Sequence, residues 1–276
     1  MRLNKFLAQS GVASRRKADE LIQMATTEVN GKICQDPAYN VKDSDVVKYD
    51  GQQISPILEK VVIMLHKPKK VITTVKDTHG RKTVLDLVPS KYRLTPVGRL
   101  DQDTTGLLLL TNDGNLHQKL SHPRNQIPKD YEAVIEGRIS SSQVQKLARG
   151  IYIGNKEYGK AEIVSQDTKK GRSIVILRLH QGKKREIRRI MHRLKLKLMT
   201  LKRFRFASLE LGDLPENHYR TLSEKEVKKI PTVCGSLREA MESLDRDRKF
   251  LTQDGVFTDD QIDAYIALKF EEIHNL

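Results

Sequence analysis

The sequence predicts an α+β protein in three parts: a small N-terminal α+β domain over residues 1–60, a mixed and largely antiparallel α+β domain over 61–229, and a helical appendage over 230–276. Three observations support this. After residue 60, strand candidates outnumber helix candidates and do not alternate regularly with them, which favours a mixed sheet over a doubly wound one. A chain of 276 residues has room for more than one core. The charge also changes sign near the last boundary. The final 46 residues carry 5 basic and 10 acidic side chains, whereas the first 230 carry 45 and 25, a net charge of +20.

Residues 1–60 begin with two short amphipathic helices. Leu3, Phe6 and Leu7 recur at helical spacing, and the Ser14 hydroxyl is placed to cap a second helix. Asn30-Gly31 indicates a tight hairpin turn. The basic residues of the two helices are Arg2, Lys5, Arg15, Arg16 and Lys17. A charge run of this kind is usually a solvated helix face. It could also bind phosphate, because backbone N–H groups point outward at the start of a helix.

The later elements follow from apolar periodicity and from turn and capping signals. Strands are expected at 61–65, 72–75, 106–111, 131–135, 174–179 and 205–211, and helices at 114–121, 140–149 and 185–194. Two capping boxes, Ser236 to Glu239 and Thr258 to Gln261, predict two helices in the appendage.

The composition of the chain limits which kinds of partner are expected. The first 230 residues, with a net charge of +20, attract polyanions, so nucleic acid is the expected partner. The longest strongly apolar run, Leu107 to Leu110, is far too short to cross a bilayer, and the N-terminus lacks the apolar core of a signal peptide. Cys34 and Cys234 imply neither a disulfide framework nor a zinc site. We therefore expect a cytoplasmic monomer with no membrane partner, metal or cofactor.

The most informative stretch is GRLDQDTTGLLLLTNDG, residues 98–114. It is a polar loop carrying Arg99, Asp101 and Asp103 that leads directly into an apolar strand. Catalytic groups often lie on loops that a rigid strand holds in place. A bare Arg-x-Asp alone is more often an ordinary acidic turn.

This string resembles the catalytic motif of the pseudouridine synthase family, in the branch that modifies bacterial ribosomal RNA, and the resemblance extends over residues 1–228. It implies that Asp101 is the essential carboxylate and that Arg99 helps to hold the extruded nucleotide. The segment PKDYE, residues 128–132, resembles the family segment that supplies an active-site tyrosine, here Tyr131.

Two further segments resemble family motifs. In HQGKKREIRRI, residues 180–190, the resemblance implies that Ile187 packs against the base and that Arg188 pairs with Asp101. Lys67, in a Lys-Pro pair, matches the first motif and is expected at the substrate. Taken alone, the stretch from Lys183 to Arg193 is simply a basic helix.

The first fifty residues resemble the small S-four-like RNA-binding domain, named after a ribosomal protein. Together with the basic helix, this domain is expected to supply a sequence-independent grip on phosphates. The predicted RNA contacts are Arg2, Lys5, Arg15, Arg16, Lys17, Lys183, Lys184, Arg185 and Arg189.

The implied reaction isomerises a specific uridine in ribosomal RNA, with the large subunit favoured, and the expected partner is ribosomal RNA or a ribosomal subunit precursor. The base must be flipped out of its stack, released from ribose, turned and rejoined through carbon. Asp101 would act on the sugar as a nucleophile or a base, and Arg188 would keep it ionised. Tyr131 would stack on the base and assist proton removal at ring carbon 5. No oxidation occurs, so no redox cofactor is implied.

Alternatives remain open at this stage. A non-catalytic RNA-binding or ribosome-assembly factor would share the charge and the first domain. A metal nuclease would use Asp101 and Asp103 together. Residues 230–276 resemble the C-terminal region of bacterial-type glutamine synthetase. No substrate-binding region of that enzyme is visible, so the resemblance suggests an appendage that could carry a protein partner.

Overall fold

A computed structural model of the chain describes residues 1–230, 241, 244–245, 248, 252 and 257–274. The chain divides into two compact units, Met1–Ile230 and Pro231–Leu276. Ile230 is 4% exposed and packs in an apolar core of the first unit. Ile230 therefore belongs to the first unit.

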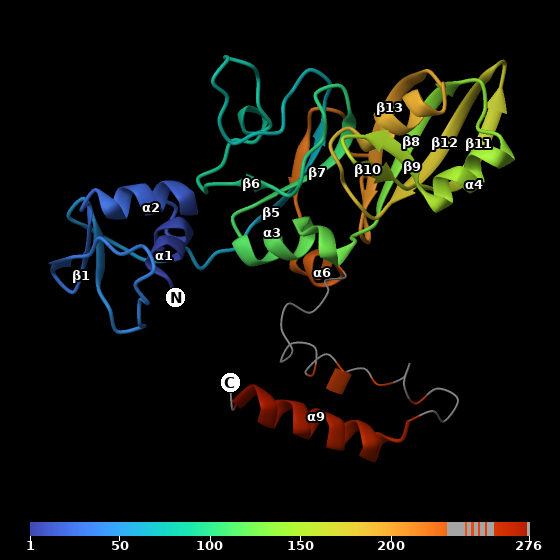
Figure 1. Cartoon of the computed structure of the whole chain (residues 1–276). Helices are drawn as coiled ribbons and strands as arrows, with labels where there is room; N and C mark the ends of the chain where they lie inside the picture. The colour runs from blue at the N-terminus through green and yellow to red at the C-terminus, as the bar shows by residue number, and fades with distance from the viewer. Residues whose placement is uncertain (231–240, 242–243, 246–247, 249–251, 253–256, 275–276) are drawn as a thin grey trace. The chain divides into compact units, whose positions relative to one another are not determined.

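The N-terminal domain (blue in Figure 1) contains helices α1 (Leu3–Gln9) and α2 (Arg15–Gln23) and an antiparallel sheet of order β2-β1-β3-β4. The strands are β1 (Thr27–Val29), β2 (Lys32–Ile33), β3 (Val47–Tyr49) and β4 (Gln52–Ile54). Ser14 accepts a hydrogen bond from the backbone N–H of Lys17 at 3.2 Å, which confirms the predicted cap. Asn30 and Gly31 both have positive φ, at 52° and 76°, as the predicted tight turn requires.

The second domain is built on a sheet of nine strands. Its main path is β11-β12-β8-β13-β7-β5-β15, with β14 paired to β13 and β6 paired to β7. The strands are β5 (Val62–Lys67), β6 (Thr95–Pro96), β7 (Thr105–Thr111), β8 (Lys129–Glu136), β11 (Glu162–Lys169), β12 (Arg172–Leu179), β13 (Leu198–Phe206), β14 (Leu209–Glu210) and β15 (Tyr219–Thr221). Within the described residues, every pairing in this sheet is antiparallel except β7 with β13.

The parallel pair β7–β13 is a seam between two halves of the sheet. Gly106 pairs with Arg203 there and has a φ of +109°. A Cβ at Gly106 would lie 2.1 Å from the carbonyl oxygen of Arg203, so only glycine allows the strands to approach this closely. Arg203 also pairs with Tyr131 of β8 on its other side. The seam therefore places the loop before β7 next to Tyr131.

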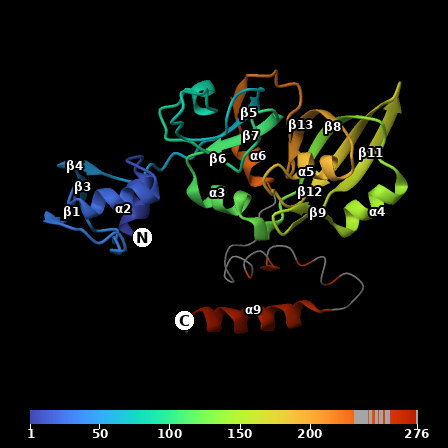
Figure 2. The same ribbon diagram turned by 45° about the horizontal axis from the view of Figure 1, so that its top comes forward.

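Four helices and a hairpin complete this domain. They are α3 (Gly114–Ser121), α4 (Ser141–Arg149), α5 (Glu186–Arg193), α6 (Glu224–Lys228) and the hairpin β9 (Ile151–Gly154)–β10 (Glu157–Gly159). Two 3₁₀ turns, Leu85–Leu87 and Pro123–Asn125, lie in the connections. The predicted helices at 114–121, 140–149 and 185–194 are confirmed to within one residue. In Figure 2, as in Figure 1, α4 lies beside the edge strand β11, which it contacts.

Two strand predictions were wrong in detail. Residues 72–75 are not a strand; Ile72 makes only an isolated bridge with Thr83. The hydroxyl of Thr73 instead donates to the carbonyl of Leu100 at 2.8 Å, because a short hydroxyl side chain competes with ladder pairing. Residues 205–211 contain the end of β13 and the whole of β14, which are separated by Ala207 and Ser208; the φ of Ala207 is 53°.

The C-terminal unit, Pro231–Leu276, contains helix α9 (Asp259–His274). Thr258 and Gln261 form the predicted reciprocal capping box, with bonds of 3.0 and 3.4 Å. Ile262, Ile266 and Phe270 pack with Met241 and Leu244, whereas Tyr265 is 48% exposed. The capping box at 236–239 lies outside the described residues. No helix in the described part of the chain is long and apolar enough to span a membrane.

Candidate active site

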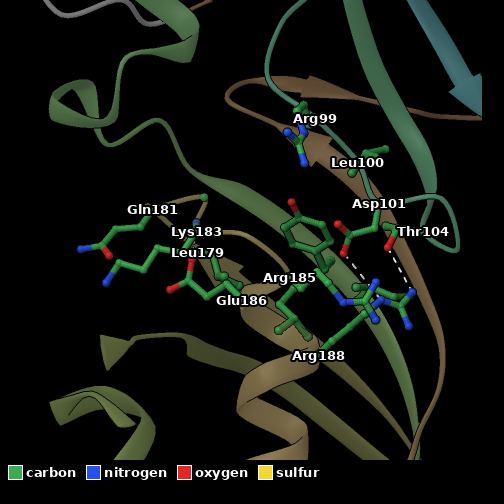
Figure 3. A pocket seen from close by; sticks show the side chains of 14 residues that line it. Arg99, Leu100, Asp101, Thr104, Leu179, Gln181, Lys183, Arg185, Glu186 and Arg188 are labelled. Atoms are coloured by element: carbon green, nitrogen blue, oxygen red, sulfur yellow. Dashed lines mark hydrogen bonds and ion pairs between the residues drawn. The ribbon is translucent and has the colours of Figure 1, made fainter. Parts of the chain in front are cut away.

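A cavity opens over the seam, and it brings together residues that are far apart in the sequence. Asp101 comes from the loop before β7, Tyr131 from β8, and Ile187 and Arg188 from α5. Figure 3 shows Asp101, Thr104 and Arg188 on one side of this cavity and Gln181 and Lys183 on the other. The three predicted catalytic residues therefore line one site.

Asp101 and Arg188 form a partly buried ion pair. Oδ2 of Asp101 lies 3.7 Å from Nε of Arg188, and the two side chains are 23% and 20% exposed. Nη2 of Arg188 donates to the backbone carbonyl of Asp103 at 3.0 Å and to Oγ1 of Thr104 at 3.2 Å. Arg188 thus holds the loop through its outer nitrogen, and its charge stabilises the negative charge of Asp101. Because 3.7 Å exceeds hydrogen-bond distance, Nε of Arg188 does not donate a hydrogen bond to the Asp101 carboxylate.

Lys67 holds the loop that carries Asp101 through hydrogen bonds to its backbone. Its side chain is fully buried, and Nζ donates to the carbonyls of Pro68 at 2.8 Å, Thr104 at 3.0 Å and Gln102 at 3.3 Å. Burial lowers the pKa of Lys67 to about 8, although Asp103 and Asp101 act in the opposite direction. Lys67 does not line the cavity among the described residues. The predicted substrate contact is therefore corrected: Lys67 positions the loop, because its ammonium is used by three backbone carbonyls.

The buried ammonium predicts a specific pH dependence of stability. In the unfolded chain Lys67 titrates near 10.5, but in the folded protein it titrates near 8. Between these values the unfolded chain binds the extra proton, so raising the pH favours the folded state. We expect the free energy of unfolding of the wild type to rise relative to Lys67→Met from pH 8 to 10.5, by up to roughly 3 kcal/mol. Denaturant unfolding at several pH values would measure this. Parallel curves would contradict the prediction, and the exposed Lys69, as Lys69→Met, is the control.

Tyr131 is presented to the cavity by the alternation of β8. The neighbouring Asp130 is 3% exposed and accepts two hydrogen bonds of 2.8 Å from Arg178 of β12. Successive side chains of a strand point to opposite faces, so the anchoring of Asp130 directs Tyr131 to the other face. The Tyr131 ring is half-buried, packs against the apolar clusters of both halves of the sheet, and lies 6.0 Å from the guanidinium of Arg203. Its position is therefore well defined by packing.

Helix α5 starts in a way that presents Ile187 and Arg188. Arg185 precedes the helix with a φ of 52°, and Lys183 and Lys184 belong to the loop before it. The Glu186 carboxylate accepts from the backbone N–H groups of Lys183 at 3.0 Å and Lys160 at 3.3 Å, and burial raises its pKa. Ile187 is 5% exposed and lines the cavity, where it can contact a flat base.

The predicted RNA contacts have different surroundings. Arg2, Arg15, Arg16 and Lys17 are exposed, Lys5 is half-buried, and Lys17 pairs with Glu20 at 2.7 Å. Arg99, Lys183, Lys184 and Arg185 line a second cavity of about 350 Å³ that also includes Asp101 and Tyr131. These positions suit contact with a bound nucleotide.

Arg189, predicted to contact RNA, makes its contacts within the protein instead. Its guanidinium donates to the carbonyls of Ile153 at 2.9 Å, Gly154 at 2.8 Å and Lys184 at 3.1 Å, and to the Glu157 carboxylate at 2.6 Å. All three of its nitrogens are engaged in holding hairpin β9–β10 on α5. Arg189 is therefore a structural residue rather than the predicted phosphate contact.

The second cavity contains cations that sequence reasoning missed. Lys129 and Arg203 line it, and Arg203 is 2% exposed with Nε donating to the Leu107 carbonyl at 2.8 Å. Burial, together with the charge of Arg203, lowers the pKa of Lys129 to about 8. No local pattern marks either residue. What links Lys129 and Arg203 to the site is that they lie on β8 and β13 close to Tyr131. The position of Arg203 opposite Tyr131 follows only from the strand register.

The described residues contain no group of three or more His, Cys, Asp and Glu side chains that could hold a metal ion. In the same described part, Asp103 lines neither cavity, and only its backbone carbonyl contacts Arg188. A metal nuclease would need both carboxylates of the loop at one site. Among the residues that the structure describes, Asp101 and Asp103 do not line a common cavity.

The fold and this site define an RNA-modifying isomerase, and comparison with known proteins agrees. The family model described as RNA pseudouridylate synthase matches residues 61–193, and the S4 domain model matches residues 1–47. Ribosomal large subunit pseudouridine synthase B of Bacillus subtilis (strain 168) is 40% identical over 232 residues, which cover 83% of this chain and 95% of that protein. The chain belongs to the pseudouridine synthase family.

Further relatives have the same extent. An uncharacterized RNA pseudouridine synthase of Aquifex aeolicus (strain VF5) is 33% identical over 85% of this chain and 95% of its own length. Another, from Mycobacterium leprae (strain TN), is 34% identical over 83% of this chain and 92% of its own length. A crystal structure of pseudouridylate synthase superposes with a TM-score of 0.60 and 25% identity, covering 84% of this chain and all of the other. The predicted fold class and enzyme class are thus confirmed.

A third family model, glutamine synthetase, catalytic domain, matches residues 208–276. This match begins inside the synthase unit, because β14, β15 and α6 precede Ile230.

Proposed function

We propose that this pseudouridine synthase converts a specific uridine in large-subunit ribosomal RNA to pseudouridine, with Asp101 as the essential group. The observation that carries the proposal is the meeting of Asp101, Arg188 and Tyr131 at one cavity. The ribosomal target is supported by the name of the Bacillus subtilis relative. A cytoplasmic monomer is part of the same proposal, and the presence of only two cysteines supports this location.

The cavity residues fit the steps of this isomerisation. The bond between N1 of uracil and C1′ of ribose breaks, the base turns, and C5 forms the new bond to C1′. The proton that leaves C5 is balanced by a proton that N1 takes up, so substrate and product are isomers. Asp101 acts on the sugar, as a nucleophile or as a base, next to the positive charge of Arg188. Ile187 and Tyr131 offer apolar and aromatic contact to the flipped base, and Tyr131 assists removal of the C5 proton. Arg99 and Lys183 lie where they can hold the extruded nucleotide.

Mapping of pseudouridine tests the substrate assignment. Ribosomal RNA from cells with and without this protein would be compared by chemical mapping. We expect one or a few uridines of the large subunit to lose modification when the protein is absent. A change confined to transfer RNA would overturn the ribosomal target while leaving the enzyme class intact.

The first helices of the S4 domain are proposed to bind phosphates. Replacing Arg15, Arg16 and Lys17 by Ala should weaken binding across RNA sequences, because counterion release does not depend on the bases. We expect the slope of log affinity against log salt to become less steep by roughly 2 to 3. Filter binding at several salt concentrations would measure it. The matched control is Lys169→Ala with Lys170→Ala, at the exposed β11–β12 turn. An unchanged slope in the triple variant would indicate a solvated face.

We also propose that residues 231–276 are a helical appendage, related to the C-terminal region of glutamine synthetase, that takes no part in catalysis and could carry a protein partner. Its support is the separate compact unit and the internal ion pairs of Arg248 with Asp245, Asp259 and Asp263. A chain ending at Ile230 should keep its turnover of uridine within roughly 2-fold, because the core of the first unit remains complete. Ending the chain at Lys229 would remove a buried core residue and should lower the melting temperature. Loss of activity in a stable chain ending at Ile230 would contradict the proposal.

A further inference from the structure

Hairpin β9–β10 presents two tyrosines on the surface. Tyr152 is 46% exposed and Tyr158 is 58% exposed. They are paired across the hairpin, with ring centroids 5.5 Å apart and the planes at 63°, an edge-to-face arrangement. Two adjacent aromatic rings with about half of their surface in solvent are costly to display, so they suggest a binding surface.

The immediate surroundings of this pair are basic. The guanidinium of Arg193 lies 5.6 Å from the ring of Tyr152. Nζ of Lys183 donates to the backbone carbonyl of Tyr158. The nearest acidic residue on the hairpin, Glu157, is already paired with Arg189 at 2.6 Å. Exposed aromatic rings beside positively charged side chains are the combination that proteins use to bind unpaired bases.

The hairpin is also firmly connected to the active site. Arg189 ties the carbonyls of Ile153 and Gly154 to α5, the helix that carries Arg188. Lys183 contacts Tyr158 and lines both cavities. The hairpin that carries the tyrosine pair therefore adjoins both cavities through Lys183, although neither tyrosine lines them.

We propose that Tyr152, Tyr158 and Arg193 form a stacking platform for an unpaired base of the RNA substrate that flanks the target uridine. This rests on the proposed function, because it takes an RNA loop as the substrate. Flipping one nucleotide leaves its neighbours without a stacking partner, and an aromatic surface compensates for that loss with little dependence on base identity. The platform would thus select single-stranded or loop RNA around the target uridine.

The test uses the full chain and a short RNA hairpin whose loop contains the target uridine. Tyr152→Ala with Tyr158→Ala should raise the Kd and KM roughly 10- to 100-fold. The kcat at saturating RNA should stay unchanged, because the catalytic cavity is not altered. Tyr152→Phe with Tyr158→Phe should restore affinity, since stacking needs the ring and not the hydroxyl. Tyr265→Ala, an equally exposed tyrosine in the second unit, is the control.

A second readout reports stacking directly. With 2-aminopurine in place of a nucleotide flanking the target, binding to the wild type should quench its fluorescence, and binding to the double Ala variant should not. Equal Kd, KM and quenching in both proteins would overturn the platform. A change in oligomeric state with unchanged RNA affinity would also overturn it, by assigning the tyrosines to a protein interface. If the wild type itself failed to modify uridine in any RNA, the proposed function would fail instead.

Discussion

Asp101→Asn should abolish the conversion of uridine, lowering kcat by roughly 10⁴-fold or more. Asn preserves the size of the side chain and most of its hydrogen bonding. It removes the charge that faces Nε of Arg188 at 3.7 Å and with it the group that acts on the sugar. The side chain is only partly buried and contributes to no apolar core, so the fold and the affinity for RNA should be retained.

The measurement follows tritium released from position 5 of uridine in a ribosomal RNA fragment, with a chelator present. Asp103→Asn is the matched control, on the same loop and with the same chemistry. It should keep most of the activity, because Asp103 contacts Arg188 through its backbone carbonyl and not through its carboxylate. Normal turnover by Asp101→Asn, or loss of wild-type activity on chelation, would contradict the assigned mechanism.

Arg188→Gln is expected to have the next largest effect, a loss of roughly 10²- to 10³-fold in kcat. Gln can still donate to the Asp103 carbonyl or the Thr104 hydroxyl, but it cannot stabilise the charge on Asp101. The Kd for RNA should change little, because Arg188 is one cation among many in a body with a net charge of +20.

Single-turnover kinetics and RNA binding separate these two quantities. Thr104→Val is the control, because it removes one of the hydrogen bonds of Arg188 while leaving the ion pair in place. We expect it to cost roughly 10-fold in kcat, the lower end of what one hydrogen bond to a charged group contributes. If Arg188→Gln raised Kd and left kcat unchanged, Arg188 would be a phosphate contact rather than the partner of Asp101.

Much of the candidate site could be predicted from short segments. The stretch 98–114 combines a polar loop with a continuous apolar run, and the structure places that run in the buried strand β7. The caps at Ser14 and Thr258 were also predictable, because they depend on residues three positions apart. The roles of Asp101, Tyr131 and Arg188 came from family resemblance, and the structure adds that they share one cavity.

The cations were harder to predict, and the reason is physical. Lys67 and Arg189 carry the positive charge expected of substrate contacts. Their ammonium and guanidinium groups instead donate hydrogen bonds to backbone carbonyls within the domain. Arg203 and Lys129 lie in strands whose sequence gives no sign of a cleft. Whether a positive group faces solvent or a carbonyl depends on which strands are neighbours, and local sequence does not contain that information.

By itself the sequence determined the charge of each part, the periodicity of each helix and most strands, the turns, and the residues able to carry the chemistry. These depend on near neighbours along the chain. Only the tertiary structure decided that β7 and β13 run parallel at Gly106, that Arg203 lies between Gly106 and Tyr131, and that Arg188 reaches Asp101. Strand register and burial are set by contacts between distant segments, and they choose which of the available charges meet in one cavity.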